Sequence, residues 1–529
     1  MIRSEPIRVK VFPMQKVIPP ELKIDVSAQP LALSDNTLAR ADGAIVLLEK
    51  SARQDKAVDA LPQAALWRKL LQAQQRSGKD APVLVSRLPN RPQTLVVVGF
   101  VKPGATGFER LELAGKLARE LLQPGIARVH LHAGEFAAAG ARTAALESLL
   151  SALLAHAAPM PEQKSKATAP CSLTSIRIDD RASAVYERSA ATAAGNHLAR
   201  WLATLPPNVL DSIAYRNALR QLARREGWSF KFIGVDQLER MGAGAFVAVA
   251  RANPHRGAGI VRLSYTPKRA RPTGASKAAR GIALVGKGIC FDTGGINLKP
   301  HRSMYSMHGD MQGSAVAVGT LLALTRLETA YPIECWLALT ENQIGPDAYR
   351  PQEVVRALNG VTIQVVHSDA EGRMVLADTL TLASRAKPRF VLDFATLTGA
   401  CVGALTDRYA GAFTNRPGLH DWLQRTGRES GERVWCFPMD EDFDADLESH
   451  AADVMQCTLD NKGDHILAAR FLGKFVEAAV PWVHVDLAPS ERKGGLAYVP
   501  TDMTGFGVRY AVYLLGDAGT LDAQLQALS

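Results

Sequence analysis

The sequence lacks the features that mark membrane and secreted proteins. Its 529 residues contain no uninterrupted run of about 18 apolar residues, so no segment is expected to span a bilayer. Residues 1–16 mix charges and prolines with apolar residues and lack the continuous apolar stretch of a secretory signal. The 6 cysteines stand far apart, without close pairs or zinc-knuckle spacing. They predict reduced thiols of a cytoplasmic protein.

Acidic residues are absent from one long stretch, residues 251–280, which holds eight of the Lys and Arg residues behind the net charge of +10. Residues 267–279 lie between two strand-like runs and are rich in Lys, Arg, Pro, Gly and Ser, which predicts an exposed hairpin loop. Such a basic loop could contact nucleic acid. A solvated loop explains the composition more simply, so nucleic-acid binding is kept as an alternative.

The usual phosphate-binding fingerprints are also absent. The glycine-rich residues 286–300 follow a strand-like run at 282–285, yet they contain neither the Walker nor the Rossmann pattern. They carry four glycines, two lysines (Lys287 and Lys299) and one acid, Asp292. Because a phosphate cradle has no use for a carboxylate, a metal site explains Asp292 better.

The length of the chain and its alternating patterns predict two α/β domains. Residues 1–160 alternate strand-like and helical runs and contain no cluster of catalytic or metal-binding residue types, so we expect a role in assembly or regulation. Residues 155–180 begin with a stretch rich in Ala, Pro, Lys, Ser and Gln, which predicts a linker. Residues 181–529 form the second, larger domain. The runs predicted for the first domain are strands at 43–48, 94–100 and 128–132 and helices at 64–76 and 107–122.

The larger domain is predicted to hold a central, mostly parallel mixed sheet flanked by helices. Strand-like runs alternate with helical patterns, and this alternation is typical of βαβ units. The expected strands are 282–285, 333–339, 361–366, 390–394 and 483–487, and the clearest helices between them are 313–327 and 374–385.

Two carboxylates and a guanidinium follow the run 361–366. Asp369, Glu371 and Arg373 lie in the turn between that run and the helix after it. In an open α/β sheet the loops beyond the carboxyl ends of parallel strands hold ligands, so these three side chains are well placed to act together. The alternative is a solvated turn whose acids pair with Arg373.

Acids in three separate loops suggest a metal centre. Asp310 lies just before the helix at 313, where its simplest role would be a helix cap. If Asp310, Asp292, Asp369 and Glu371 converge, their mutual repulsion requires divalent cations, and more than one. Two ions about 3.5–4 Å apart are a common arrangement for activating a water. Carboxylates admit Zn²⁺, Mn²⁺ or Mg²⁺.

Four segments resemble a known family: Lys287 with Asp292 and Lys299, residues 307–311 around Asp310, the Ser-Asp-Ala-Glu-Gly-Arg run at 368–373, and the Ala-Thr-Leu-Thr-Gly-Ala run at 395–400. They look like the leucyl (cytosol) aminopeptidase family of dinuclear metallopeptidases. The resemblance covers about the whole second domain. It implies removal of a leucine-like residue from a free peptide amino terminus in a cytoplasmic homohexamer.

The resemblance also implies roles for individual residues. One metal ion would be held by Lys287, Asp292, Asp310 and Glu371, and the other by Asp292, Asp369 and Glu371, with Zn²⁺ or Mn²⁺ in both sites or Mg²⁺ in one. Lys299 would stabilise the oxyanion. Arg373 would anchor a bicarbonate ion that acts as general base. Met307, Thr396, Leu397 and Gly399 would line the substrate pocket, although ordinary core packing is their alternative role.

Two departures from the family pattern concern the edge of this site. His367 and Ser368 replace the Asn-Thr pair that commonly precedes the Asp-Ala-Glu-Gly-Arg run. His367 is expected to be structural, and its alternatives are a hydrogen bonder beside the site or a proton carrier. Residues 460–465 replace a loop that contains glycine and arginine in the family. The substrate range is therefore less certain than the chemistry. All seven metal and catalytic positions hold the expected residue types, which argues against a degenerate pseudoenzyme.

Three functions follow, in order of preference. The first is a metal-dependent aminopeptidase acting on peptides. The second is a DNA-binding accessory protein with secondary peptidase activity, supported by the basic residues 268–280. The third is a metal-dependent phosphoryl hydrolase that uses the same acids.

Overall fold

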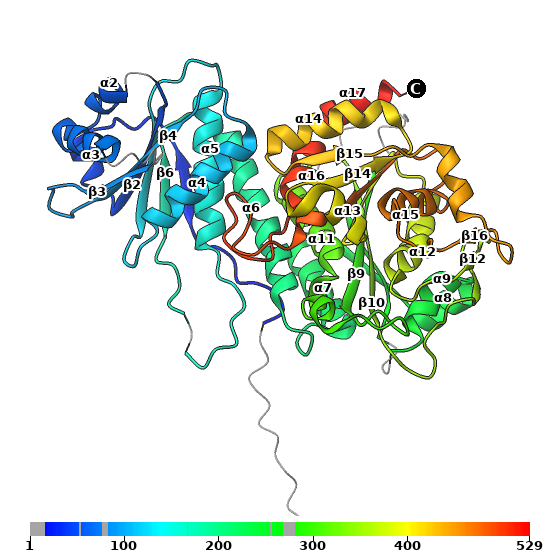
Figure 1. Cartoon of the computed structure of the whole chain (residues 1–529). Helices are drawn as coiled ribbons and strands as arrows, with labels where there is room; N and C mark the ends of the chain where they lie inside the picture. The colour runs from blue at the N-terminus through cyan, green and yellow to red at the C-terminus, as the bar shows by residue number, and fades with distance from the viewer. Residues whose placement is uncertain are drawn as a thin grey trace, which may run out of the picture.

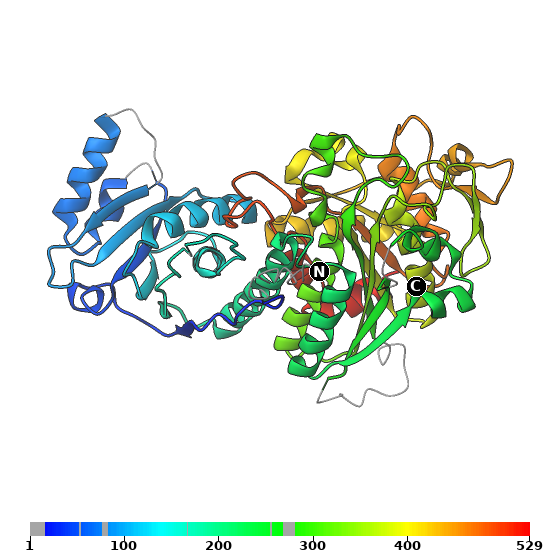
Figure 2. The same cartoon turned by 90° about the horizontal axis from the view of Figure 1, so that it is seen from below.

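Two separate β-sheets dominate the computed structural model of the chain, and they lie side by side with α5 and α6 between them (Figures 1 and 2). One sheet has six strands and the other has eight. The structure describes residues 16–51, 54–76, 83–166, 168–253, 257–267 and 281–528. The basic residues 268–280 that support nucleic-acid binding lie outside these ranges.

The smaller sheet is parallel except at one edge, where β3 and β4 run antiparallel. Its strands, in spatial order, are β1 (Asp25–Ala28), β6 (Ser175–Ile178), β5 (Arg128–Ala133), β2 (Gly43–Glu49), β4 (Leu95–Val101) and β3 (Val83–Arg87). Its helices are α1 (Asp35–Leu38), α2 (Gln54–Asp59), α3 (Ala64–Arg76), α4 (Gly107–Leu121) and α5 (Ala141–Ala157). The five elements predicted here from the sequence all occur, with bounds within one residue of those predicted.

The segment predicted as a linker contains part of this sheet. Helix α5 continues to Ala157, and β6 then pairs with both β1 and β5. Residues 155–180 therefore include the end of α5 and a strand of the smaller sheet, and they are followed by α6 (Ser183–Thr204).

The larger sheet has a parallel centre, which is joined to the strands on either side by antiparallel pairs. Its strands, in spatial order, are β15 (Val434–Cys436), β14 (Ala410–Thr414), β17 (Trp482–Asp486), β13 (Phe390–Ala395), β9 (Ile282–Asp292), β10 (Ile333–Asn342), β8 (Gly259–Tyr265) and β7 (Ser229–Gly234). The antiparallel pairs are β17 with β14 and β10 with β8. The four strands β17, β13, β9 and β10 are parallel to their neighbours in this set, so their carboxyl ends meet at one edge.

Helices cover both faces of this sheet, as predicted. Successive side chains of a strand point to opposite faces. On β9, Ile282 and Leu284 belong to one core cluster, while Ala283 and Val285 belong to the other. The helices of this unit are α6, α7 (Ser212–Glu226), α8 (Val235–Met241), α9 (Gly244–Ala250), α10 (His301–Met304), α11 (Gln312–Arg326), α12 (Glu371–Arg385), α13 (Gly399–Leu405), α14 (His420–Ser430), α15 (Asp464–Gly473), α16 (Val508–Leu515) and α17 (Ala518–Gln526).

Two details of this sheet differ from the prediction. Strands β9 and β10 continue past the predicted residues 285 and 339 to Asp292 and Asn342, because they stay paired with each other to these residues. The run 361–366 is not a strand of the central sheet: only β12 (Thr362–Gln364) forms, in a small sheet with β11 (Val354–Arg356) and β16 (Val454–Met455). The loop that carries Asp369 therefore follows a strand outside the central sheet.

Two predictions from composition agree with the structure. All six cysteines are free thiols. Within the described part of the chain, no helix combines the length and apolar character needed to cross a membrane.

Candidate active site

Lys287 and Asp292 stand on β9, at the centre of the large sheet. Lys287 lies inside the strand, in register with Ala338 of β10, and Asp292 ends the strand opposite Asn342. The lysine side chain runs against the first turn of α12, where a Cβ at Gly372 would lie 2.6 Å from its Cε. A glycine is required there for the lysine to reach the site.

Asp310 lies between the 3₁₀ turn η2 (Met307–Gly309) and α11. Its Oδ1 accepts a hydrogen bond from Thr396 Oγ1 at 2.7 Å and lies 2.8 Å from Lys287 Nζ. Its Oδ2 is buried and has no hydrogen-bond partner among the described residues. The simplest role predicted, a helix cap, is wrong, because the N-cap position is Met311 and no side chain caps α11. Asp310 therefore offers one oxygen to a ligand.

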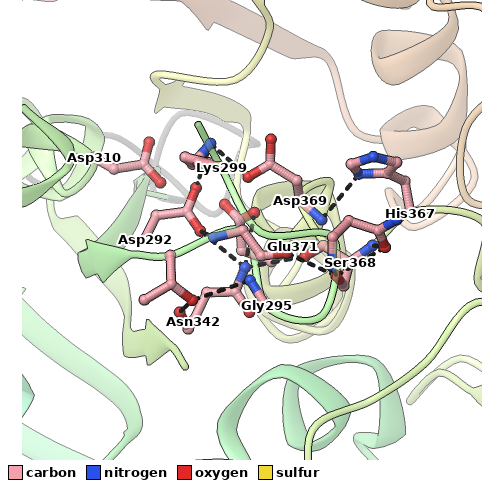
Figure 3. Close-up of polar contacts among 12 residues, drawn as sticks. Asp292, Gly295, Lys299, Asp310, Asn342, His367, Ser368, Asp369 and Glu371 are labelled. Carbon is pink, nitrogen blue, oxygen red and sulfur yellow. Dashed lines mark hydrogen bonds and ion pairs between the residues drawn. The ribbon is translucent and has the colours of Figure 1, made fainter. Parts of the chain in front are cut away.

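Ser368 and Asn342 hold the loop that carries Asp369. Ser368 Oγ donates to the carbonyl of Gly294 at 2.7 Å. Asn342 Nδ2 donates to Asp292 Oδ1 at 2.9 Å and to the carbonyl of Ser368 at 3.0 Å (Figure 3). One amide thus ties the loop to the end of β9. The sequence prediction missed Asn342, although a polar residue at the end of a central strand was the available signal.

The predicted acids converge at the edge of the sheet (Figure 3). Asp292, Asp369 and Glu371 each offer one oxygen, and these oxygens lie within 4.8 Å of one another. Lys299 Nζ lies 2.8 Å from Asp292 Oδ2 and 2.5 Å from Asp369 Oδ1. Lys287 Nζ lies 3.0 Å from Glu371 Oε1. The alternative of a solvated turn paired with Arg373 does not describe this geometry.

Burial and mutual repulsion raise the pKa values of the acids. Desolvation, reinforced by the charges of Glu371 and Asp292, raises the pKa of Asp310 to about 8. Burial and the charge of Asp292 raise the pKa of Asp369 to about 6 and also raise the pKa of Glu371. The fold therefore concentrates more negative charge here than its own lysines neutralise.

The pKa values of the two lysines are also raised, because the acids around them stabilise the charged ammonium groups. Burial disfavours the charged form of Lys287, but Asp310, Glu371 and Asp292 outweigh it and raise the lysine pKa. The pKa of Lys299 is raised in the same way, mainly by Asp292. Four buried or half-buried acids against two amines leave an excess of carboxylate. Oxygen donors in this number, with one unpartnered oxygen on Asp310, fit divalent metal ions.

Arg373 is paired with a carboxylate of its own chain. Its Nη2 donates to both oxygens of Asp464, at 2.7 and 2.9 Å, and its Nη1 donates to the carbonyl of Gln456 at 3.1 Å. The Gln456 side chain accepts from the backbone N–H of His367 and donates to the carbonyl of Ala370, which fixes the loop before α12. Neither Asp464 nor Gln456 was identified from the sequence, and no local motif marks them.

His367 forms a hydrogen bond beside the acids. Its Nδ1 accepts from the backbone N–H of Asp369 at 3.2 Å. Burial, together with the nearby charges of Lys299 and Arg373, lowers its pKa, which favours the neutral ring that can accept this bond. This bond lies within the loop itself, so it fits the structural role expected for His367 as well as that of a hydrogen bonder beside the site.

A cavity of about 790 Å³ opens over the acids and the two lysines. The four residues predicted to line the substrate pocket, Met307, Thr396, Leu397 and Gly399, all line it. So do Arg373 and Asp464. An apolar wall and a charged floor thus share one space.

Asp486 anchors the apolar wall. It ends β17 and is buried, and burial raises its pKa. Its Oδ1 accepts from the backbone N–H of Leu397 at 3.1 Å, and its Oδ2 accepts from Thr398 Oγ1 at 2.6 Å. The sequence prediction placed a strand here but did not single out this residue.

Comparison with known proteins assigns this site to a family. The catalytic-domain model of the cytosol aminopeptidase family matches residues 197–512. A probable cytosol aminopeptidase of Bradyrhizobium sp. (strain BTAi1) is 34% identical over 483 residues, which cover 89% of this chain and 93% of that protein. Another, from Sulfurihydrogenibium sp. (strain YO3AOP1), is 36% identical over 326 residues, or 61% of this chain and 62% of that protein.

A solved structure has the same architecture. The bottromycin maturation enzyme BotP in complex with Mn superposes with a TM-score of 0.77 at 28% identity, covering 92% of this chain and 99% of BotP. The family match extends over more than half of the chain and includes every residue of the candidate site. The chain therefore belongs to the cytosol aminopeptidase family, whose members are metal-dependent aminopeptidases.

Proposed function

We propose that this protein is an aminopeptidase that hydrolyses the first peptide bond of peptides with a free amino terminus. The observation that carries the proposal is the convergence of Asp292, Asp369 and Glu371, with Lys287 and Lys299, on the floor of an apolar-walled cavity. A floor of this kind suits metal-assisted hydrolysis, and the wall suits an apolar first residue.

Two divalent ions, Zn²⁺ or Mn²⁺ in both positions or Mg²⁺ in one, would be held by five residues. Lys287, Asp292, Asp310 and Glu371 would hold one ion, and Asp292, Asp369 and Glu371 would hold the other. When bound, the ions would grip the free amine and the scissile carbonyl and lower the pKa of a water. The unpartnered Oδ2 of Asp310 and the excess of carboxylate support this assignment.

Lys287 can serve as a ligand only in its neutral form. Its Nζ donates to the carbonyl of Thr396 at 2.9 Å, a bond that a neutral amine also makes. The lone pair would then face the carboxylates. Two dications would reverse the electrostatics that raise its pKa in the protein alone.

Lys299 would stabilise the oxyanion that forms on the scissile carbonyl. Its ammonium group is mostly buried and is held between Asp292 and Asp369. A donor that is fixed before the reaction stabilises developing charge without reorganisation, and such a donor typically contributes about 10²–10³-fold in kcat.

The pocket walls support a preference for a leucine-like first residue. Leu397 and Met307 supply apolar surface, and Gly399 leaves space at the start of α13. Asp486 holds the backbone of this wall through Leu397 and Thr398. A branched aliphatic side chain matches such a surface better than a charged one.

Bicarbonate on Arg373 does not fit the site as it stands. The guanidinium already donates to both oxygens of Asp464 and to the carbonyl of Gln456. An incoming anion would have to displace a carboxylate that belongs to the protein. We therefore derive no step through bicarbonate.

The proposal also covers the roles of the two units, the oligomeric state and the cellular location. We assign catalysis to residues 181–529 and give the smaller sheet unit a role in assembly or regulation. The homohexamer and the cytoplasmic location are expected from the family resemblance. Sedimentation of the purified protein would test the first of these two expectations.

Hydrolysis of a panel of aminoacyl amides, with Zn²⁺ or Mn²⁺ added, tests the function. We expect leucyl amide to be cleaved, the activity to disappear on chelation, and the activity to return with metal. Glu371→Ala should bind less metal and lose activity. Turnover of none of the amides, or full activity in Glu371→Ala, would overturn the proposal.

A further inference from the structure

The pairing of Arg373 with Asp464 places a carboxylate of the chain itself inside the catalytic cavity. The two side chains are 2% and 12% exposed, and both line the cavity that contains Asp369 and Lys299. A buried charge pair with two short hydrogen bonds is a fixed feature of the site.

Asp464 is not needed to cap its own helix. It is the first residue of α15, and the N-cap position is Gly463, with φ of 60° and no side-chain cap bond. Its backbone N–H bonds to the carbonyl of Asn461. The hydrogen bonds of its carboxylate go instead to Arg373, which stands on another helix two residues after Glu371.

We infer that Asp464 takes the place of a dissolved bicarbonate ion and serves as the carboxylate base of this enzyme. The inference rests on the proposed aminopeptidase function and supplies the general base that this function requires. The Nη1 and Nη2 groups of Arg373 already donate to Gln456 and Asp464, so activity is independent of added bicarbonate.

The proton-transfer step balances with groups that the chain provides. As the oxygen of the attacking water bonds to the carbonyl carbon, one O–H bond breaks and its proton passes to an Asp464 oxygen. The electron pair of the C=O bond moves to the carbonyl oxygen, which Lys299 faces. When the C–N bond breaks, the proton on Asp464 passes to the leaving amine, and the carboxylate is regenerated.

Asp464→Gly tests the inference because it removes the carboxylate and leaves Arg373 in place. In bicarbonate-free buffer the wild type should be fully active, and added bicarbonate should change its kcat less than about 2-fold. The variant should lose about 10²–10⁴-fold in kcat, the usual contribution of a general base. Bicarbonate or formate should restore at least about 10-fold of that loss.

Anion binding gives a readout that does not depend on turnover. A ligand that binds only the folded protein raises its melting temperature by mass action. Bicarbonate should therefore raise the melting temperature of Asp464→Gly, and isotope-labelled bicarbonate should bind it. The wild type should show neither effect. Glu162→Gly, an acid of the smaller unit that pairs with Lys164 and lies outside the cavity, is the matched control and should behave as the wild type does.

If Asp464→Gly does not fold, Asp464→Asn replaces it. The amide oxygen can still accept from Arg373 but takes no proton, so kcat should fall while KM stays within about 2-fold, again by the scale of general-base catalysis. Stimulation of the wild type by bicarbonate, or full kcat in either variant without it, would overturn the inference. If the wild type cleaves no aminoacyl amide in any buffer, the proposed function itself fails.

Discussion

The two sheets of this protein share a parallel architecture but differ in the residues that end their strands. In the smaller sheet β4 ends at Val101 and β5 at Ala133. In the larger sheet β9 ends at Asp292, β10 at Asn342 and β17 at Asp486. The carboxyl edge of a parallel sheet is a binding position in both cases. The smaller sheet has one acid there, Glu49 at the end of β2, whereas three of the four central strands of the larger sheet end in a polar residue. Chemistry follows from these terminal residues and not from the architecture.

The two regions also treat buried charge differently. The larger sheet gathers four acids and two lysines in one cavity, an arrangement that calls for metal ions. The smaller sheet buries His130 and His132 on β5, where desolvation lowers the pKa of each to about 4 and keeps the rings neutral. The larger unit therefore keeps charged side chains in its cavity, whereas burial in the smaller sheet keeps these two histidines uncharged.

The largest expected effect is a loss of kcat when a glutamate of the candidate site is replaced by glutamine. The same replacement at the edge of the smaller sheet is its control. Glu371→Gln removes a charge that the proposal shares between two ions, so several kcal/mol of transition-state stabilisation are lost. We expect kcat to fall about 10³-fold or more. Leucyl amide hydrolysis and metal content measure the result.

The matched substitution in the smaller sheet is Glu49→Gln, at the end of β2. There Glu49 accepts a hydrogen bond from the backbone N–H of Ala137 and lies outside the catalytic cavity. Its kcat should equal that of the wild type. Equal losses in the two variants would remove the contrast between the sheets.

The sequence predicts the part of this site that is local in the chain. Lys287, Asp292, Asp369 and Glu371 stand beside strong strand or helix patterns, so their positions follow from those patterns. The position of Asp464, the partner of Arg373, does not follow from a local pattern. Asp464 lies 91 residues further along the chain, and only the packing of α15 against α12 brings it near. Pairing between distant helices leaves no periodic signal.

For the fold too, local sequence patterns identify elements but not their distant partners. The strands and helices predicted in the smaller unit lie within one residue of their observed bounds, because their apolar periodicity is regular, but β1, β3 and β6 were not predicted. Helix α12 begins at Glu371, three residues before its predicted start. The run 361–366 is as β-branched as a central strand, yet β12 pairs only with β11 and β16. Local propensity predicts an extended segment and does not identify its partners.

A buried ion pair joins the two regions, and breaking it gives the next largest effect. Arg509 Nη2 of α16 lies 2.7 Å from Glu147 Oε2 of α5, and both side chains are nearly inaccessible. Glu147→Ala leaves Arg509 buried without its partner, which should lower the free energy of unfolding by about 3–5 kcal/mol. Urea unfolding measures the change.

The control for this pair is an exposed one on α4. Lys116→Ala removes a partner 3.5 Å from Glu112, with both side chains about half exposed, and should cost at most about 0.5 kcal/mol. Similar losses in the two variants would show that the buried pair does not hold the two regions together.

The buried histidines of the smaller sheet predict a dependence on pH. His132 lies 3.8 Å from Asp179, but desolvation dominates and lowers its pKa, as it does for His130. A histidine with a lowered pKa binds its proton more readily in the unfolded chain. Stability should therefore fall as pH drops below about 6.5, and the loss should level off near pH 4.

The size of this effect is about 2 kcal/mol for each histidine between pH 7 and pH 5, or about 4 kcal/mol for the two together. Urea unfolding of the wild type and of a His130→Gln, His132→Gln variant at both pH values measures it, since other groups titrate equally in the two proteins. The variant should lose less stability on acidification. If the wild type and the variant lost the same stability between the two pH values, the histidines would not be held neutral by burial.

The smallest effect compares two threonines that perform the same capping role. Thr106 caps α4 in a capping box with Glu109, and Thr398 caps α13 by accepting from the backbone N–H of Cys401. Replacing either by alanine should cost about 1 kcal/mol for the cap. Urea unfolding and the kinetics of leucyl amide hydrolysis distinguish the two variants.

Only Thr398 also donates to Asp486, the buried carboxylate that holds the backbone of Leu397. Thr398→Ala therefore leaves a buried acceptor with one partner fewer and loosens the wall of the substrate cavity, which should raise KM for leucyl amide. Thr106→Ala has no such connection and should change stability alone. If both variants kept the wild-type KM, the wall would not depend on Asp486. If both raised it, the smaller sheet unit would be coupled to catalysis, because the cap it loses lies on the helix that packs against α14 of the larger unit.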